Sequence, residues 1–174
     1  MSDLGLSASV AVATVLVMAA IPKLRDPKAF YVIVREFGVV PASLVGPVAH
    51  ALPIAELLVA AGLIVPSLRR GSAIAAATLI GVFTVATLIA LGRSSGVPCG
   101  CFGMDRTSTV SRLSLIRNGS LLCLAITAAA AYSSQRFSFP AVTAGLGTTM
   151  LILLLERTAT TIKGHWIRSG SAWG

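Results

Sequence analysis

The sequence predicts an all-α protein, a polytopic transmembrane helical bundle of four to five spans. Only 11% of the 174 residues are charged and the mean hydropathy is +0.87, whereas soluble domains are about 25% charged. The apolar residues form long continuous blocks without the alternation of membrane β-strands. We expect one bundle domain over residues 1–156 and a basic tail over 157–174. The chain is therefore expected to cross a membrane several times.

Each of five apolar blocks is expected to form a helix. The blocks cover residues 4–22, 42–65, 72–91, 113–132 and 139–155. A span needs about 20 residues, so the first four qualify and the fifth is marginal. The first block has no basic segment before it, and we therefore expect a retained span rather than a cleaved signal peptide. On the third block, small residues at i, i+4 and i+8 predict a face that packs closely on a neighbour; they are Ala73, Ala77 and Gly81.

A short amphipathic helix is predicted between the first two blocks. Asp26 suits an N-cap, Pro27 suits the first helical position and Gly38 suits the C-terminal stop. Apolar residues then follow the helical i, i+3, i+4, i+7 pattern at Phe30, Ile33, Val34 and Phe37. This helix either lies at the membrane interface or covers the end of the bundle, and the two positions are compatible.

The net charge of +8 arises from 14 basic and 6 acidic residues. The basic residues are scattered between the apolar blocks and form no patch. We therefore expect them to contact lipid headgroups at the bilayer surface, and we expect no nucleic-acid binding.

The polar stretch between the third and fourth blocks contains the motif Cys99-Gly100-Cys101-Phe102-Gly103. A disulfide needs Cα atoms about 4.4–6.8 Å apart, which cysteines two residues apart reach only with a bent backbone. Gly100 permits that bend. The small ring would be strained, and strained disulfides are the labile ones. The pair therefore suggests a thiol–disulfide oxidoreductase, although two buried cysteines can also act as small apolar residues.

A soft-metal site is the main alternative for the same segment. Cys99 and Cys101 with the thioether of Met104 suit Cu(I), or half of a zinc site. A closed zinc site needs two more ligands, and the only histidines are His50 and His165.

Polar residues inside the apolar blocks are the other candidates. Glu56 is the only carboxylate deep in a block, where charge is costly, so it is expected to be protonated or paired with a base such as Lys23 or Arg117. Arg117 either stabilises a nearby thiolate or reaches the headgroups. Asn118 could form hydrogen bonds within the bundle. Cys123 is expected to pack as a small buried residue.

These residues together resemble the methylamine-utilisation MauE family, within the DoxX-like group of small membrane proteins. The resemblance covers about residues 5 to 155. It rests on Lys23 closing the first span, the Leu52-Pro53-Ile54-Ala55-Glu56-Leu57 segment, the Cys-Gly-Cys-Phe-Gly motif, and Arg117-Asn118 opening the fourth span.

The resemblance implies a bundle of about four spans that works beside a thioredoxin-like partner. In the family's pathway the beneficiary is the disulfide-rich small subunit of methylamine dehydrogenase, an exported protein. Cys99 and Cys101 would be the redox pair. The polar framework would be Lys23, Glu56, Arg117 and Asn118. A membrane quinone is the cofactor considered for the electrons, although no residue identifies a quinone site, and a non-catalytic scaffold for a redox or biosynthetic partner is the remaining alternative.

Two features of the sequence predict opposite orientations in the membrane. With five spans, most basic residues share the side of the cysteines, which the positive-inside rule places in the cytoplasm. They are Lys23, Arg25, Lys28, Arg35, Arg93, Arg106, Arg112, Arg157, Lys163 and Arg168. Disulfide donation needs the oxidising outer side, and the tight Arg69-Arg70 turn marks the opposite side as cytoplasmic. We expect a bacterial-type cytoplasmic (inner) membrane with the cysteines on its outer side.

Overall fold

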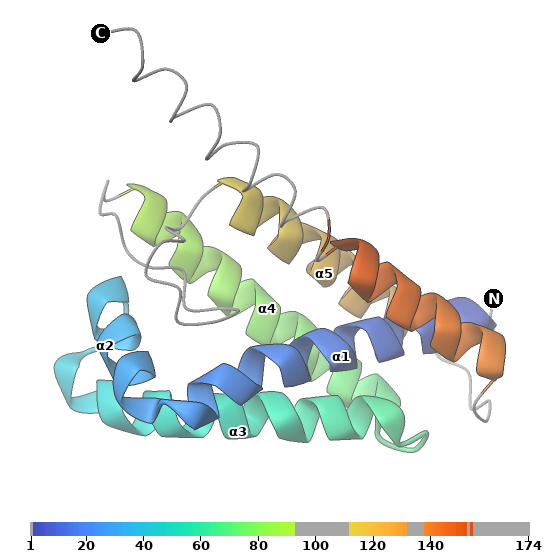
Figure 1. The fold of residues 1–174 in the computed structure, drawn as a ribbon, viewed down its shortest axis with the longest axis horizontal. Coiled ribbons are helices and arrows are strands. Elements are labelled where there is room, and N and C mark those ends of the chain that lie inside the picture. The colour runs from blue at the N-terminus through green and yellow to red at the C-terminus, as the bar shows by residue number, and fades with distance from the viewer. Residues whose placement is uncertain (1, 93–111, 132–137, 153, 155–174) are drawn as a thin grey trace, which may run out of the picture.

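The computed structural model describes residues 2–92, 112–131, 138–152 and 154, and the secondary-structure elements of this part of the chain are helices (Figure 1). The predicted all-α class is confirmed. The elements in order are α1 (Ser2–Arg25), α2 (Pro27–Phe37), the 3₁₀ turn η1 (Ala42–Leu44), α3 (Val45–Ile64), α4 (Arg69–Gly92), α5 (Arg112–Ala130) and a last helix, Phe139–Ile152.

Long apolar helices are present, as predicted for a polytopic bundle. Within the described ranges, three are long and apolar enough to cross a bilayer: Asp3–Arg25, Ala42–Ile64 and Arg69–Gly92. Two more apolar helices are shorter, Leu115–Ala130 and Phe139–Ile152. The basic tail predicted over 157–174 lies outside the described residues.

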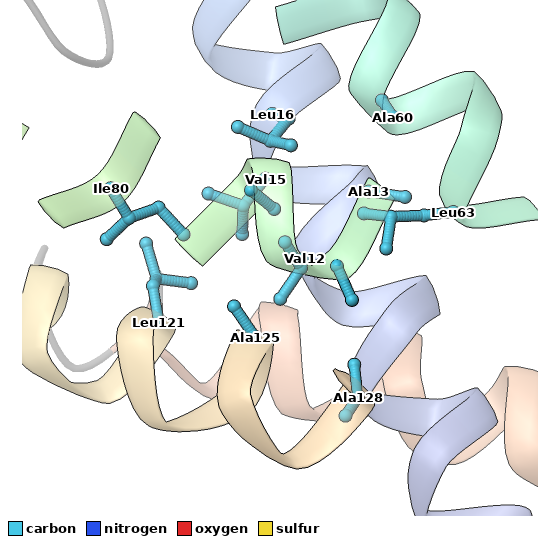
Figure 2. Close-up of a cluster of buried hydrophobic side chains, with 13 residues drawn as sticks. Val12, Ala13, Val15, Leu16, Ala60, Leu63, Ile80, Leu121, Ala125 and Ala128 are labelled. Carbon is cyan, nitrogen blue, oxygen red and sulfur yellow. The ribbon is translucent and has the colours of Figure 1, made fainter. Parts of the chain in front are cut away.

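Four helices form a closed ring around the core. α1 packs against α3 and α5, and α4 completes the ring by packing against the same two helices. Figure 2 shows the apolar cluster at the centre, with Val12 and Leu16 of α1 meeting Leu63 of α3, Ile80 of α4 and Leu121 of α5. The end of α1, the start of α3, the end of α4 and the start of α5 all lie at the end of the bundle that carries α2 (Figure 1). We call this the α2 end.

The predicted amphipathic helix is present as α2, with both of its predicted caps. Asp26 Oδ1 accepts a hydrogen bond from the Ala29 backbone N–H at 3.0 Å. Gly38 ends the helix with a left-handed φ of 62°, and its N–H donates to the Arg35 carbonyl. The apolar side packs on the first turns of α3 through Phe30, Ile33 and Val34, which contact Val45 and Ala49. Of the two predicted positions, α2 therefore takes the one that covers the bundle.

The last helix, Phe139–Ile152, lies across the N-terminal half of α1. Its closest approach is at Gly145, where an added Cβ would lie 2.6 Å from the Ser7 carbonyl oxygen and 2.9 Å from the Val10 Cβ. Thr149 Oγ1 also donates a hydrogen bond to the Ala11 carbonyl at 3.3 Å. A glycine is thus required at this contact, because any side chain there would push the two helices apart.

The small-residue face predicted for α4 is only partly correct. Ala73 is fully buried and Ala77 packs against the core cluster, but farther along the helix the buried position is Ile80 rather than Gly81. An added Cβ at Gly81 would have no neighbour within 4 Å. A stripe at i, i+4, i+8 drifts by about 80° over its length, so its last member has turned away from the helix that the first one touches.

Candidate functional site

A buried ion pair between α1 and α3 is the most polar feature of the bundle interior. Lys23 Nζ donates to Glu56 Oε1, and the two residues are only 4% and 1% exposed. Of the two bases proposed from the sequence as partners for Glu56, the structure pairs it with Lys23. Because Lys23 lies in the last turns of α1 and Glu56 lies in the middle of α3, the pair holds these helices in a fixed register.

Two aromatic rings complete the surroundings of the lysine. The Lys23 ammonium lies 5.3 Å from the ring centroid of Phe30 in α2 and 4.9 Å from that of Phe83 in α4. A cation over an aromatic face is attracted to the π electrons, and more strongly so where water is excluded. One side chain of α1 therefore interacts with α2, α3 and α4 at once.

The sequence did not identify these rings as part of the site. The sequence predicts Phe30 only as an apolar residue of α2, and it predicts no contact with the site for Phe83, which lies inside an apolar block. The signal for Phe30 was its place a few residues after Lys23. Nothing in the sequence distinguished Phe83 from the lipid-facing residues around it.

α5 brings two further polar residues to the same place. Arg117 and Asn118 are each 5% exposed, and they line a small cavity of about 40 Å³ together with Lys23 and Glu56. Apolar side chains from α1, α4 and α5 form the rest of its wall. The four residues named from the sequence as a polar framework thus meet around one cavity, although they come from three helices.

The cysteine pair lies outside the described residues, as do Met104 and His165. The segment that contains the pair, residues 93–111, joins the end of α4 to the start of α5, and both of these lie at the α2 end (Figure 1). Arg117 is five residues into α5, or about 7.5 Å along the helix axis. The polar cavity is therefore located in the half of the bundle from which the cysteine segment leaves and to which it returns.

The described histidine does not approach the polar cavity. His50 is exposed on α3, and its Nδ1 forms a hydrogen bond with the Gly46 carbonyl at 2.9 Å. Among the residues with described positions, no group of three or more His, Cys, Asp and Glu side chains could hold a metal ion. The alternative metal site thus gains no ligand set from this part of the chain.

The prediction that Cys123 packs as a small buried residue is wrong, because Cys123 is exposed. The inner face of α5 is formed by Leu121 and Ala125. Cys123 is two residues from each, a rotation of about 200° around the helix, so its thiol faces outward from the bundle.

A quinone head group does not fit the polar cavity. An engineered cavity that binds benzene has a volume of about 150 Å³, whereas this one has about 40 Å³. A quinone ring with its two oxygens is larger than benzene. We therefore derive no reaction step through a quinone at this site.

Comparison with known proteins gives consistent matches. The family model described as "Methylamine utilisation protein MauE" matches residues 1–131. A methylamine utilization protein MauE from Methylophilus methylotrophus is 34% identical over 162 residues, 90% of this chain and 84% of that protein. The protein of the same name from Paracoccus versutus is 37% identical over 87% of this chain and 83% of its own length. For that of Paracoccus denitrificans the identity is 41%, over 67% of this chain and 63% of the relative. No solved structure matches the chain.

Proposed function

The chain belongs to the MauE family, and from this membership we propose that it is a membrane thiol–disulfide redox protein. Its Cys99 and Cys101 would exchange disulfides with a thioredoxin-like partner during the maturation of exported proteins, in the methylamine utilisation for which its relatives are named. The observation that supports this is the buried polar cavity. It collects Lys23, Glu56 and two α5 residues in the half of the bundle to which the cysteine segment is attached.

The proposed reaction is a balanced exchange between two thiol pairs. A thiolate of the reduced partner attacks one sulfur of the Cys99–Cys101 disulfide, and the other sulfur leaves as a thiolate. The second partner thiolate then breaks the mixed disulfide. The partner ends with a disulfide, and Cys99 and Cys101 end as a dithiol after taking up two electrons and two protons. Reversal of the same steps oxidises this chain at the partner's expense.

Arg117 is the residue proposed to support this chemistry electrostatically. A thiolate is the attacking and leaving species, and a nearby cation stabilises it relative to the thiol. Arg117 is buried near the start of α5 and is fixed among the other polar residues of the cavity. Arg117 lies on α5, the helix that directly follows the cysteine segment, so it is the cavity cation proposed to act on a thiolate there.

For the membrane orientation we propose that the α2 end faces the outer side of the inner membrane. Exported substrates and an oxidising environment are found there. Basic residues exposed at the α2 end, such as Lys28 and Arg35, argue for the opposite orientation through the positive-inside rule. Arg69, at the other end, is buried and bonded to the Leu63 carbonyl. It therefore has a structural role and is a weaker marker of the cytoplasmic face than the sequence suggested.

Thiol labelling of intact cells tests both the pair and its orientation. We expect a membrane-impermeant, mass-shifting maleimide to label Cys99 and Cys101 only after mild reduction. Cys99→Ser and Cys101→Ser should each remove one label, and Cys123→Ser should leave both labels unchanged, because Cys123 lies on the lipid-facing side of α5. Labelling that requires permeabilised cells would place the pair in the cytoplasm and exclude disulfide donation to exported proteins.

Partner exchange is tested with the purified protein in nanodiscs. The oxidised protein should convert a thioredoxin-like dithiol to its disulfide in a single turnover, with one equivalent oxidised per chain. The activity should be lost in both cysteine variants and kept in Cys123→Ser. Unchanged partner oxidation in the Cys99→Ser/Cys101→Ser double variant would leave the scaffold alternative standing. Stoichiometric copper or zinc that is lost in Cys99→Ser would instead identify a metal site.

A further inference from the structure

Two buried polar atoms at the cavity have no hydrogen-bond partner among the residues that the structure describes. One is Glu56 Oε2, the carboxylate oxygen that does not contact Lys23, and the other is Asn118 Nδ2. Both residues are at least 95% buried, and both line the cavity of about 40 Å³. One atom is an acceptor and the other is a donor, on helices that face each other across the ring.

Leaving such atoms unpaired inside a membrane is costly. A buried donor or acceptor without a partner loses its hydration without compensation, and the loss is larger for a charged oxygen than for an amide. No water from the bilayer core is available to offset this. We therefore expect the cavity beside Glu56 Oε2 and Asn118 Nδ2 to hold a group that forms hydrogen bonds with these atoms.

We propose that the cavity binds water, and that this water links the Glu56 carboxylate to the Asn118 amide. A water molecule donates to Oε2 and accepts from Nδ2, which matches the two unsatisfied atoms. A cavity needs roughly 10–15 Å³ of volume accessible to a water-sized sphere to hold one water, and this one has about 40 Å³. The space therefore accommodates a small water cluster.

Other occupants fit the same surroundings less well. A metal cation would face the Lys23 ammonium, which already binds the carboxylate. An anion would leave Glu56 Oε2 unsatisfied, because it brings no hydrogen-bond donor for a carboxylate oxygen. A ligand the size of a benzene ring exceeds the volume. Neutral water is repelled by neither charge, and it can donate and accept hydrogen bonds at the same time.

The water site is independent of the thiol chemistry, since it contains neither cysteine. Its effect is to give Glu56 Oε2 and Asn118 Nδ2 the hydrogen bonds that the described protein groups do not supply. The polar framework then consists of protein side chains and internal water together.

Magnetic resonance of the full-length protein in lipid nanodiscs tests the proposal. We expect a cross-peak between water and the side-chain amide protons of Asn118, with the sign of a long-lived bound molecule. Ala19→Val adds two methyl groups at a residue that lines the cavity, and it should abolish this cross-peak. Ala61→Val adds the same groups on the exposed side of α3, and it should leave the cross-peak intact. No cross-peak at an assigned Asn118 amide, or one that survives Ala19→Val, would overturn the proposal.

A second measurement needs only the wild-type protein. Hydroxyl radicals generated by a brief X-ray pulse modify side chains that lie next to bound water. Leu121 and Leu63 are both buried, at 4% and 0% exposed, but only Leu121 lines the cavity. Rapid modification of Leu121 with none at Leu63 supports the water site, and equal protection of the two leucines contradicts it.

Discussion

At the scale of single residues, the Lys23–Glu56 pair explains why charge is present inside an apolar bundle. A charged residue at the centre of a membrane helix costs about 2.5–3.5 kcal/mol on insertion scales. The structure offsets this by bringing the two opposite charges into contact and by placing Phe30 and Phe83 over the ammonium. The pair is therefore an interdependent unit, in which each charge depends on the other.

Removing one charge of the pair should be more damaging than removing both. Lys23→Met or Glu56→Met alone leaves an uncompensated buried charge, which typically costs about 3–5 kcal/mol. The double variant leaves no charge and should lie within about 1 kcal/mol of the wild type, because buried ion pairs are often replaced by apolar residues at little cost. The measurement is the free energy of unfolding in a detergent titration.

Lys28→Met serves as the control for this comparison, since Lys28 is exposed on α2 and its loss should change little. The two charges would act separately if the loss of unfolding free energy in the double variant equalled the sum of the losses in the two single variants. The view of the pair as one unit would then be wrong.

Sequence reasoning found the residues of the site more readily than their contacts. Glu56 stands out because a carboxylate is rare inside an apolar block, and Lys23 and Arg117 stand out as bases near block ends. The choice between Lys23 and Arg117 as its partner was beyond the sequence, because it depends on which helices adjoin α3. The contribution of Phe83 was also hidden, since a phenylalanine in a membrane span usually faces lipid or core without any polar neighbour.

At the scale of elements, specific contacts hold the ends of α2 and α3, and the end of α3 is the clearest case. Arg69, the first residue of α4, is buried and its Nε donates to the Leu63 carbonyl at 3.2 Å. The carbonyls of the last helical turn have no partners within the helix, and a cation there also opposes the negative end of the helix dipole. Arg69 therefore joins the end of α3 to the start of α4.

Arg69→Gln should lower the free energy of unfolding by about 1.5–3 kcal/mol, the range for a hydrogen bond from a charged group. Arg70→Gln removes the same charge from the exposed neighbour, and it should stay within about 0.5 kcal/mol of the wild type. Detergent-titration unfolding of both variants under identical conditions gives the comparison. Equal losses in the two variants would mean that the net charge of this turn matters and the contact with Leu63 does not.

The sequence predicted helix ends better than helix faces. Both caps of α2 were readable, because Asp26 before Pro27 and a glycine at position 38 are strong local signals that require no tertiary contact. The sequence did not predict that Cys123 faces outward. It also did not predict that Gly81 points away from the helix that packs against Ala73 of α4. In a membrane the inner and outer faces of a helix are both apolar, so periodicity carries little information about which face meets a neighbour.

At the scale of the whole molecule, the last helix adds a fifth apolar element against the ring. Its contact with α1 depends on a close backbone approach at Gly145 and on the hydrogen bond from Thr149 to the Ala11 carbonyl. The sequence left this block as a marginal span because of its length. The described helix, Phe139–Ile152, is indeed shorter than the three full-length spans.

Gly145→Ala should separate the last helix from α1, because the added Cβ meets the backbone oxygen of Ser7 at 2.6 Å. We expect a loss of about 1–3 kcal/mol in the free energy of unfolding, as for other overpacked sites. Gly147→Ala is the matched control, since an added Cβ there has no neighbour within 4 Å, and it should gain up to about 1 kcal/mol from helix propensity.

A cysteine cross-link between the last helix and α1 can report the same contact directly. Efficient cross-linking in a Gly147→Ala background together with its loss in Gly145→Ala is the expected result. Two variants with the same stability and the same cross-linking would show that this helix does not rely on the close approach.

The pairing of Lys23 with Glu56 also constrains how the protein is assembled during synthesis. Lys23 is made 33 residues before Glu56, so the first helix leaves the ribosome with a cation that has no counterpart yet. The transfer of α1 from the translocation machinery into lipid becomes favourable when α3 arrives with the Glu56 carboxylate. α1 and α3 are therefore expected to enter the bilayer together, as a hairpin released in one step, with α2 as the connection between them.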